Sequence, residues 1–237
     1  MKAVDRLCEH TYIPNLLHAG STVFDFGANE GKFSHGMIAR HGCRVFAAEP
    51  VSELRAGIKP SPALTLLPFA VGGTKERAKV NIFGSRCASL LRRNGDEALD
   101  GEQDTEVLDL RSIFELSGVD RVNLMKVDIE GSEIGMFDSA SDEDLRRCTQ
   151  ITVEFHDFIY PEQRPQVEAI KKKLHSLGFW VINFSLDNTD VLFLNAATSG
   201  IGLLQYWRLK YLTKYAKGLA RRFGRRGNSL ASEGEGI

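Results

Sequence analysis

Short apolar runs and helical repeats alternate along the first 200 residues of the chain. The runs expected to form buried strands cover residues 22–26, 44–48, 64–71, 122–127 and 151–155, and a closing antiparallel pair covers 178–184 and 191–195. The helical patterns between them cover residues 31–41, 111–116 and 161–177. Strands and helices in this alternation predict an α/β fold, with a mostly parallel sheet and helices on both faces.

Three segments depart from the alternation. Residues 1–20 are expected to form a helical lead-in, broken near Pro14, ahead of a domain that covers residues 21–197. Residues 79–103 begin like a strand and continue as an irregular polar insertion, which makes them a candidate lid over a substrate. Residues 200–224 predict a basic amphipathic helix, and residues 225–237 are expected to be disordered.

The composition, 43% hydrophobic and 26% charged, is that of a globular chain with one sizeable core. The four cysteines are far apart and form no C-x-x-C pair, which argues against a zinc site or a disulfide framework. Charges interrupt every apolar run near the N-terminus, and no run approaches the roughly 20 residues of a membrane span. These observations predict a cytoplasmic protein.

Charge is distributed unevenly along the chain, with a net +6 from Leu203 onward and a net −7 before it. An acidic body makes nucleic acid a disfavoured partner. In the tail, basic residues are interleaved with an imperfect apolar stripe at i+4 spacing: Trp207, Tyr211, Tyr215, Leu219 and Phe223. Such a helix packs on its own domain or forms a homodimer, which we favour, or it lies on the inner face of a membrane as a peripheral contact.

The segment DFGANEG, residues 25–31, directly follows the first predicted strand. Gly27 and Gly31 permit backbone angles closed to other residues, so a ligand can lie against the main chain. Asp25 at the strand end can accept hydrogen bonds from an amine or a hydroxyl. The spacing is not the G-x-G-x-x-G of dinucleotide enzymes, and Glu30 disfavours a pyrophosphate. The turn therefore favours an amino-acid-like ligand, although an ordinary strand-to-helix loop has the same appearance.

Further polar residues stand where other predicted strands end. Glu49, 24 residues after Asp25, is placed to bind both hydroxyls of a ribose, although a solvated loop carboxylate would look the same. Ala70 and Val71 could wall an adenine ring or simply end a buried strand. Because ligands of such sheets bind at the carboxyl ends of the strands, we expect one site there.

Two pairs of ionisable residues end the fourth and fifth predicted strands. Asp128 and Glu130 share one face of their segment, as do Glu154 and His156. These four side chains could instead gather a magnesium or manganese ion, an alternative that we disfavour because spacing alone does not show convergence. Glu133 opens the next helix, where an acid favourably meets the helix dipole.

Four segments together resemble the FkbM family of class I S-adenosylmethionine-dependent methyltransferases: DFGANEGKFS (25–34), AEP (48–50), LMKVDIEGSE (124–133) and VEFH (153–156). The resemblance covers roughly residues 20–195, and KVDIEGSE is its most specific part. It implies a Rossmann-like, doubly wound sheet of seven mostly parallel strands with the last antiparallel. It also implies S-adenosyl-L-methionine as cofactor and a hydroxyl acceptor on a sugar, glycan, polyketide or related metabolite.

By position, the resemblance implies that four residues cradle the methionine part of the donor: Phe26, Gly27, Asn29 and Gly31. Asp25 would lie near the amine of the donor, and Glu49 would hold its ribose. Ala70 and Val71 would border the adenine, and Asp128 would lie beside the donor near the acceptor.

Transfer of a methyl group to an alcohol needs an aligned acceptor and benefits from a base within about 3 Å. His156 is the first choice for this base because the ordinary pKa of histidine lies near neutrality, and Asp128 or Glu154 would orient or assist it. A histidine that merely satisfies a loop carbonyl is the structural alternative.

Two other function classes stay open. A nicotinamide-dependent oxidoreductase is disfavoured by the missing G-x-G-x-x-G and by the lack of a recognisable Tyr-x-x-x-Lys pair. A non-catalytic module that binds S-adenosylmethionine would carry the same pocket, and only turnover separates it from an enzyme.

Overall fold

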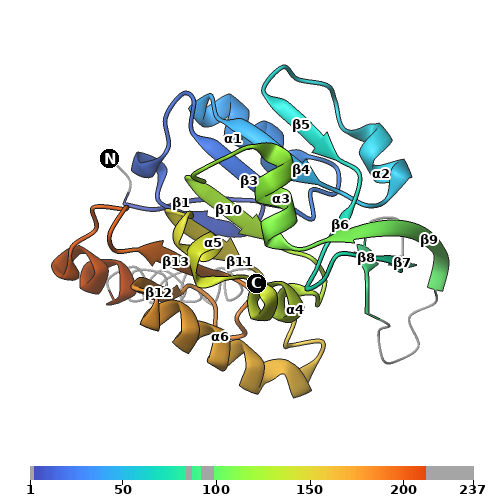
Figure 1. Cartoon of the computed structure of the whole chain (residues 1–237). Helices are drawn as coiled ribbons and strands as arrows, with labels where there is room; N and C mark the ends of the chain where they lie inside the picture. The colour runs from blue at the N-terminus through green and yellow to red at the C-terminus, as the bar shows by residue number, and fades with distance from the viewer. Residues whose placement is uncertain (1–2, 84–86, 92–98, 212–237) are drawn as a thin grey trace, which may run out of the picture. The chain divides into compact units, whose positions relative to one another are not determined.

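A seven-stranded sheet forms the centre of the computed structural model, which describes residues 3–83, 87–91 and 99–211 (Figure 1). Its strands, in spatial order, are β12 (Phe179–Asn183), β13 (Val191–Asn195), β11 (Gln150–Val153), β10 (Leu124–Val127), β3 (Thr22–Phe26), β4 (Arg44–Ala48) and β5 (Leu64–Leu67). The five strands from β11 to β5 run parallel, and β13 is antiparallel to both of its neighbours. The predicted mostly parallel sheet is confirmed.

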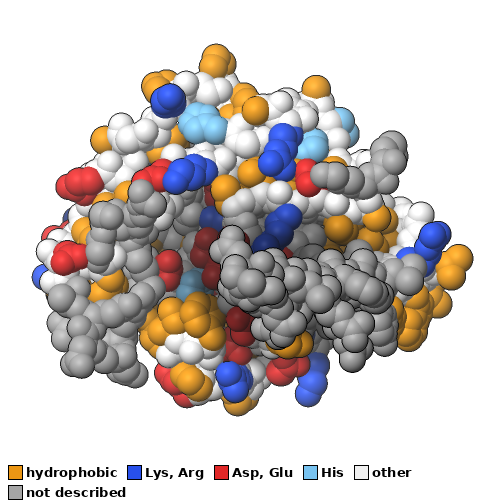
Figure 2. All heavy atoms as spheres, turned by 180° about the vertical axis from the view of Figure 1, so that it is seen from behind, with side chains coloured by type: hydrophobic (Ala, Val, Ile, Leu, Met, Phe, Trp, Pro, Cys, Tyr) orange, Lys and Arg blue, Asp and Glu red, His pale blue; other side chains and the backbone are white. Residues whose placement is uncertain are grey.

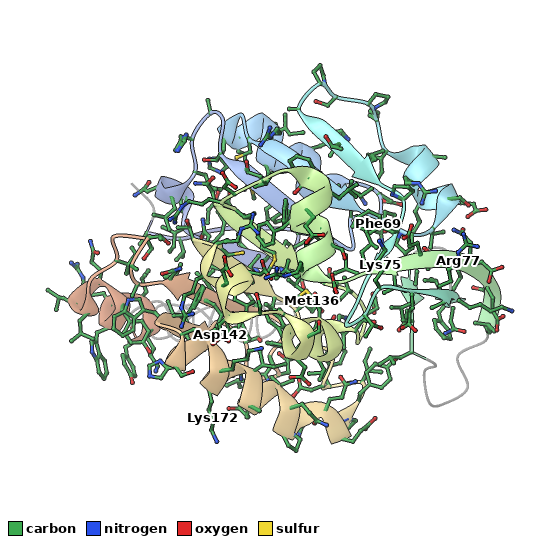
Figure 3. The ribbon with its side chains drawn as sticks, in the orientation of Figure 1. Phe69, Lys75, Arg77, Met136, Asp142 and Lys172 are labelled. Atoms are coloured by element: carbon green, nitrogen blue, oxygen red, sulfur yellow. The ribbon has the colours of Figure 1, made fainter. Side chains whose placement is uncertain are left out.

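Helices cover both faces of this sheet: α1 (Lys32–His41), α2 (Ser52–Gly57), α3 (Leu110–Ser117), α4 (Glu133–Ser139), α5 (Asp142–Arg146) and α6 (Arg164–Ser176). Side chains alternate between faces along a strand. Phe24 and Phe26 therefore share a core with residues of α3 to α6, whereas Val23 packs with α1. Figure 3 shows Met136 of α4 within the body and Lys172 of α6 pointing away from it.

The N-terminal segment is a β-hairpin, so the predicted helical lead-in is wrong. Strand β1 (Asp5–Leu7) pairs antiparallel with β2 (His10–Tyr12), and a short 3₁₀ helix, η1 (Pro14–Leu16), follows. Cys8 and Glu9 take left-handed backbone angles that end any helix and reverse the chain. The hairpin is held by distant side chains, and a local pattern does not reveal them.

The predicted third strand, residues 64–71, is also wrong in one respect, since it divides at Pro68 between two sheets. Proline lacks an N–H group and interrupts the ladder. Strand β5 stays in the main sheet, whereas β6 (Ala70–Val71) joins β7 (Glu76–Phe83), β8 (Cys87–Ser89) and β9 (Leu99–Leu108) in a second sheet with the order β6-β9-β7-β8 (Figure 1). Much of the expected irregular insertion at 79–103 therefore consists of antiparallel strands, with β7 between β8 and β9; residues 84–86 and 92–98 lie outside the described residues.

The C-terminal unit begins at Ile201, and residues 203–211 are helical. The rings of Trp207 and Tyr211 stack with centroids 5.0 Å apart, as side chains one helical turn apart can. The rest of the predicted tail helix, and the expected disorder at 225–237, lie outside the described residues, so its partner stays a prediction. Within the described part of the chain, no helix is both long and apolar enough to span a bilayer.

We expect replacement of Phe24 by Ala to destabilise the fold strongly. Phe24 is fully buried, and its ring lies 5.3 Å from Phe114, 5.5 Å from Phe26 and 5.8 Å from Phe46. Loss of such a ring leaves a cavity and costs about 3–5 kcal/mol of unfolding free energy, which urea denaturation measures. The control Leu116→Ala, on an exposed side chain of α3, should change that free energy by less than about 0.5 kcal/mol. Equal effects of the two variants would contradict this account of the core.

Candidate active site

The turn after β3 has backbone angles that its sequence permits. Gly27, Asn29 and Gly31 have φ of 77°, 52° and 72°, the left-handed region that glycine and asparagine tolerate best. A Cβ atom at position 27 would lie 1.8 Å from the main-chain oxygen of Asp128, so only glycine fits. A Cβ at position 31 would lie 2.8 Å from a side-chain carbon of Ile58. The glycines thus let Asp128, after β10, and Ile58, after α2, approach the turn closely.

An open cavity of about 580 Å³ lies at the carboxyl ends of β3, β4 and β10. Its lining includes six of the residues predicted to hold a cofactor: Gly27, Asn29, Glu49, Ala70, Val71 and Asp128. Figure 2 shows Asp and Glu side chains gathered at a hollow on the face opposite to that of Figure 1. The structure therefore brings together residues spread over 102 positions of the chain, as expected if a ligand binds at the carboxyl ends of the strands.

Glu49 is 3% exposed, and its carboxylate is held in place by two backbone N–H groups. Asn29 donates to Oε2 over 2.7 Å, and Val51 donates to Oε1 over 2.9 Å. Burial raises the pKa of Glu49, while these two N–H groups oppose the rise. Each oxygen retains a lone pair that can accept a further hydrogen bond, because a carboxylate oxygen has two lone pairs.

The opposite wall of the cavity is apolar and comes from the second sheet. Ala70 and Val71 of β6 line it together with Val80 of β7 and with Ala88 and Leu90 at β8. The hydroxyl of Ser89 donates to the main-chain oxygen of Glu130 over 2.6 Å, which ties β8 to the segment after β10. The insertion thus forms part of the same cavity that Glu49 lines.

Three of the predicted cofactor residues build the turn and are not among the residues that line this cavity. The carboxylate of Asp25 is fully buried, accepts a hydrogen bond of 2.6 Å from Ser34 and lies 3.3 Å from the ammonium of Lys126. Phe26 places its ring in the core, and Gly31 packs against Ile58. Asp25 therefore faces a lysine of its own chain where an amine of the donor was expected.

Lys126 was missed by sequence reasoning, although a lysine inside the buried run LMKV is an available signal. Its ammonium is paired with Asp25 and Asp128, and it donates to the main-chain oxygens of Phe26 and Gly27. Burial alone would lower the pKa of Lys126, but the two carboxylates outweigh burial and raise it. Lys126 therefore stays charged.

Glu133 organises the segment after β10. Its fully buried carboxylate accepts from the N–H groups of Ile129 and Gly131 at 3.0 Å and 3.1 Å and lies 2.9 Å from Nδ1 of His156. Glu130, between Ile129 and Gly131, has a φ of 55°, a conformation that costs energy for a residue other than glycine. The acid predicted to favour the dipole of the next helix thus also holds this turn and orients His156.

Both ring nitrogens of His156 face carboxylates, since Nε2 lies 3.3 Å from Glu130 and 3.8 Å from Asp128. Burial by itself lowers the pKa of His156, but the hydrogen-bonded Glu133 and the two other acids raise it to about 9. A carboxylate only accepts hydrogen bonds, so this setting favours an imidazolium with a proton on each nitrogen. At neutral pH, such a ring does not accept another proton.

The other acids of the cluster titrate differently. Burial, followed by the charge of Asp128, raises the pKa of Glu154 to about 7 although His156 opposes the rise. Burial also acts against the charged form of Asp128, but Lys126 and His10 hold the pKa of that carboxyl well below its usual range. Environments that separate the pKa values of neighbouring acids are typical of catalytic sites.

Among the described residues, two sets of three side chains have potential ligand atoms within 4.8 Å of one another: His10, Asp128 and Glu154, and Asp128, Glu130 and His156. The four residues considered for a metal ion in the sequence are divided between these two sets, which share Asp128, and neither set contains all four. His10 was missed, because nothing in the sequence links the hairpin to β10.

A comparison with protein families matches residues 25–181 to the Methyltransferase FkbM domain. Among solved structures, methyltransferase FkbM from Methylobacillus flagellatus KT is 15% identical with a TM-score of 0.47, over 74% of this chain and 43% of that one. The fibrillarin pre-rRNA processing protein of Methanococcus jannaschii is 10% identical with a TM-score of 0.43, over 80% and 68%.

Phosphoethanolamine N-methyltransferase 2 of Haemonchus contortus, in complex with S-adenosyl-L-methionine, is 13% identical with a TM-score of 0.38, over 92% of this chain and 47% of that one. A comparison with curated proteins finds no significant match. The chain aligns with less than half of the FkbM structure from Methylobacillus flagellatus KT. Because the family match covers well over half of the sequence and includes the glycine turn, Glu49 and the segment after β10, the chain belongs to the FkbM methyltransferase family.

Proposed function

We propose that the protein is an S-adenosyl-L-methionine-dependent methyltransferase that acts on a hydroxyl group. The observation that carries the proposal is the single cavity lined at once by the Gly27 turn, the Glu49 carboxylate and the apolar wall at Ala70 and Val71. The sheet order and the antiparallel β13 agree with the class I methyltransferase fold that the family resemblance implies.

The donor set of the cavity fits the parts of S-adenosyl-L-methionine. Glu49, with both oxygens fixed by N–H groups, presents lone pairs for two ribose hydroxyls. Ala70, Val71 and Leu90 offer an apolar surface to an adenine ring. The turn at Gly27 and Asn29 would hold the methionine part, and Asp128, directly beside this turn, also lines the cavity.

When bound, this donor supplies a methyl group on an electrophilic sulfonium. The protein has to align an acceptor oxygen, exclude water and remove a proton. For the base we choose Glu154, because one of its carboxylate oxygens lies within 4.8 Å of an oxygen of Asp128, which lines the cavity. Its pKa, raised to about 7, leaves part of it as a carboxylate at neutral pH. His156 then acts as a fixed cation held by Glu133 and faces Asp128 and Glu130.

The acceptor that we propose is a small molecule or a glycan, with its hydroxyl on a sugar, polyketide or related metabolite. The described part of the insertion, at β7 and β8, borders the cavity beside the segment after β10 and is a candidate for acceptor selection. A screen of hydroxylated metabolites and glycans, with release of S-adenosyl-L-homocysteine as the signal, would identify the acceptor.

We expect Glu49→Gln to raise the dissociation constant of S-adenosyl-L-homocysteine about 10-fold. An amide accepts through one oxygen only and carries no charge, so it loses hydrogen bonds that each contribute about 1–3 kcal/mol. Calorimetry measures the affinity, with the exposed neighbour Glu53→Gln as control. Unchanged affinity in Glu49→Gln would refute the ribose role of Glu49. If the wild-type protein binds NAD tightly but binds neither S-adenosyl-L-methionine nor S-adenosyl-L-homocysteine, an oxidoreductase is favoured instead.

The pH dependence of turnover should be bell-shaped. Activity should rise as pH increases through about 7, because Glu154 has to lose its proton, and fall above about 9, where His156 loses its charge. Glu154→Gln should reduce turnover by about 100-fold or more, and His156→Ala should also lose turnover, while both bind the donor nearly normally. Unchanged turnover in either variant would remove that residue from the mechanism, and activity that survives exhaustive chelation would exclude a catalytic metal ion.

A further inference from the structure

The N-terminal hairpin adopts a turn that its residues do not favour. Cys8 and Glu9 connect β1 to β2 with φ of 45° and 70°. A two-residue hairpin turn with positive φ at both positions is normally built from Asn-Gly, because other side chains are strained there. Contacts to the rest of the domain must therefore hold this conformation.

Those contacts come from buried side chains far away in the sequence. Asp190, 1% exposed, accepts from the N–H and the hydroxyl of Thr11 at 3.0 Å and 2.7 Å. The fully buried amide of Gln150 accepts from Ile13 N–H at 2.9 Å and donates to its main-chain oxygen at 3.3 Å. The hairpin is thus fixed against β11 and the start of β13.

This docking places His10, which is fully buried, between the ends of two central strands. Its Nε2 lies 3.5 Å from Oδ2 of Asp128, its Nδ1 lies 3.5 Å from the hydroxyl of Thr152, and its ring meets Phe33 edge to face. A carboxylate only accepts, so in a neutral ring Nε2 carries the proton and Nδ1 accepts from Thr152.

His10 and Lys126 both contact the same carboxylate oxygen of Asp128, Oδ2. Lys126 lies 3.4 Å from Oδ2, and Oδ1 is the oxygen that faces His156. Cys8 at the hairpin tip lines a second hollow together with Gly27, Lys126 and Asp128. This hollow shares Gly27, Asn29 and Asp128 with the cavity of the proposed donor site, so the hairpin borders residues of that site.

We propose that the N-terminal hairpin is part of the donor site and that His10 is a positioning residue, which holds Oδ2 of Asp128 so that Oδ1 stays turned toward His156. The inference rests on the proposed function, since it assigns Asp128 to the donor. The family match begins at residue 25, so the hairpin lies outside the part of the chain that the family describes.

The test compares two replacements of His10 in the full chain, with S-adenosyl-L-homocysteine as the probe. Leu removes the hydrogen bond, whereas Gln keeps an N–H donor at nearly the position of Nε2. We expect His10→Leu to raise the dissociation constant of the probe about 10-fold and His10→Gln to stay within about threefold of wild type. The matched control is His18→Leu, an exposed histidine of the same segment, which should leave the affinity unchanged.

If His10→Leu fails to fold, Thr152→Val provides a second measurement. This variant keeps His10 and removes the Thr152 hydroxyl that faces Nδ1 of His10. A positioning role predicts about threefold weaker binding in Thr152→Val and retained binding in His10→Gln. A role in packing alone predicts a silent Thr152→Val and equal losses in the two His10 variants, and that result would overturn the proposal. Folded His10→Leu with wild-type affinity would do the same, whereas a wild-type protein that binds no probe would refute the proposed function.

Discussion

The buried ammonium of Lys126 is the interaction on which the site depends. It joins the ends of β3 and β10 by pairing with Asp25 and Asp128 and by donating to the main-chain oxygens of Phe26 and Gly27. A buried charge is costly unless it is paired and hydrogen-bonded, and the Lys126 ammonium has two carboxylate partners and two main-chain acceptors. The geometry of the glycine turn and the direction of the Asp128 carboxylate follow from the same contact.

A second organising element is the concentration of acids after β10 and β11. Glu133 fixes the turn at residues 129–131 with two N–H groups and fixes His156 with the same carboxylate. Because Asp128, Glu130 and Glu133 surround one imidazole, the pKa of His156 is raised to about 9, and Glu154 is therefore the base that we propose. The surroundings of Glu154 and His156 shift the pKa of each, and these shifts favour Glu154 as the proposed base. The ordinary pKa values of glutamate and histidine would instead favour His156.

The cavity also depends on two segments that stand outside the alternation of strands and helices. The second sheet contributes Ala70, Val71 and Leu90 to the lining of the cavity, and the N-terminal hairpin contributes Cys8 to a second hollow and His10 to the contact with Asp128. The proposed methyltransferase site therefore depends on a central sheet that presents acids at the ends of its strands and on the two added segments that border them.

The sequence by itself determined the central sheet, the turn and the strand-end acids, because local periodicity and glycine positions encode them directly. Strands β3, β4 and β13 and the location of Glu49 and Asp128 follow from these patterns. Only the tertiary structure decided that Asp25 pairs with Lys126, that His156 is enclosed by carboxylates, and that residues 5–12 form a hairpin instead of a helix. These features depend on hydrogen bonds and charges between residues up to 179 positions apart, such as Thr11 and Asp190, which no local pattern contains.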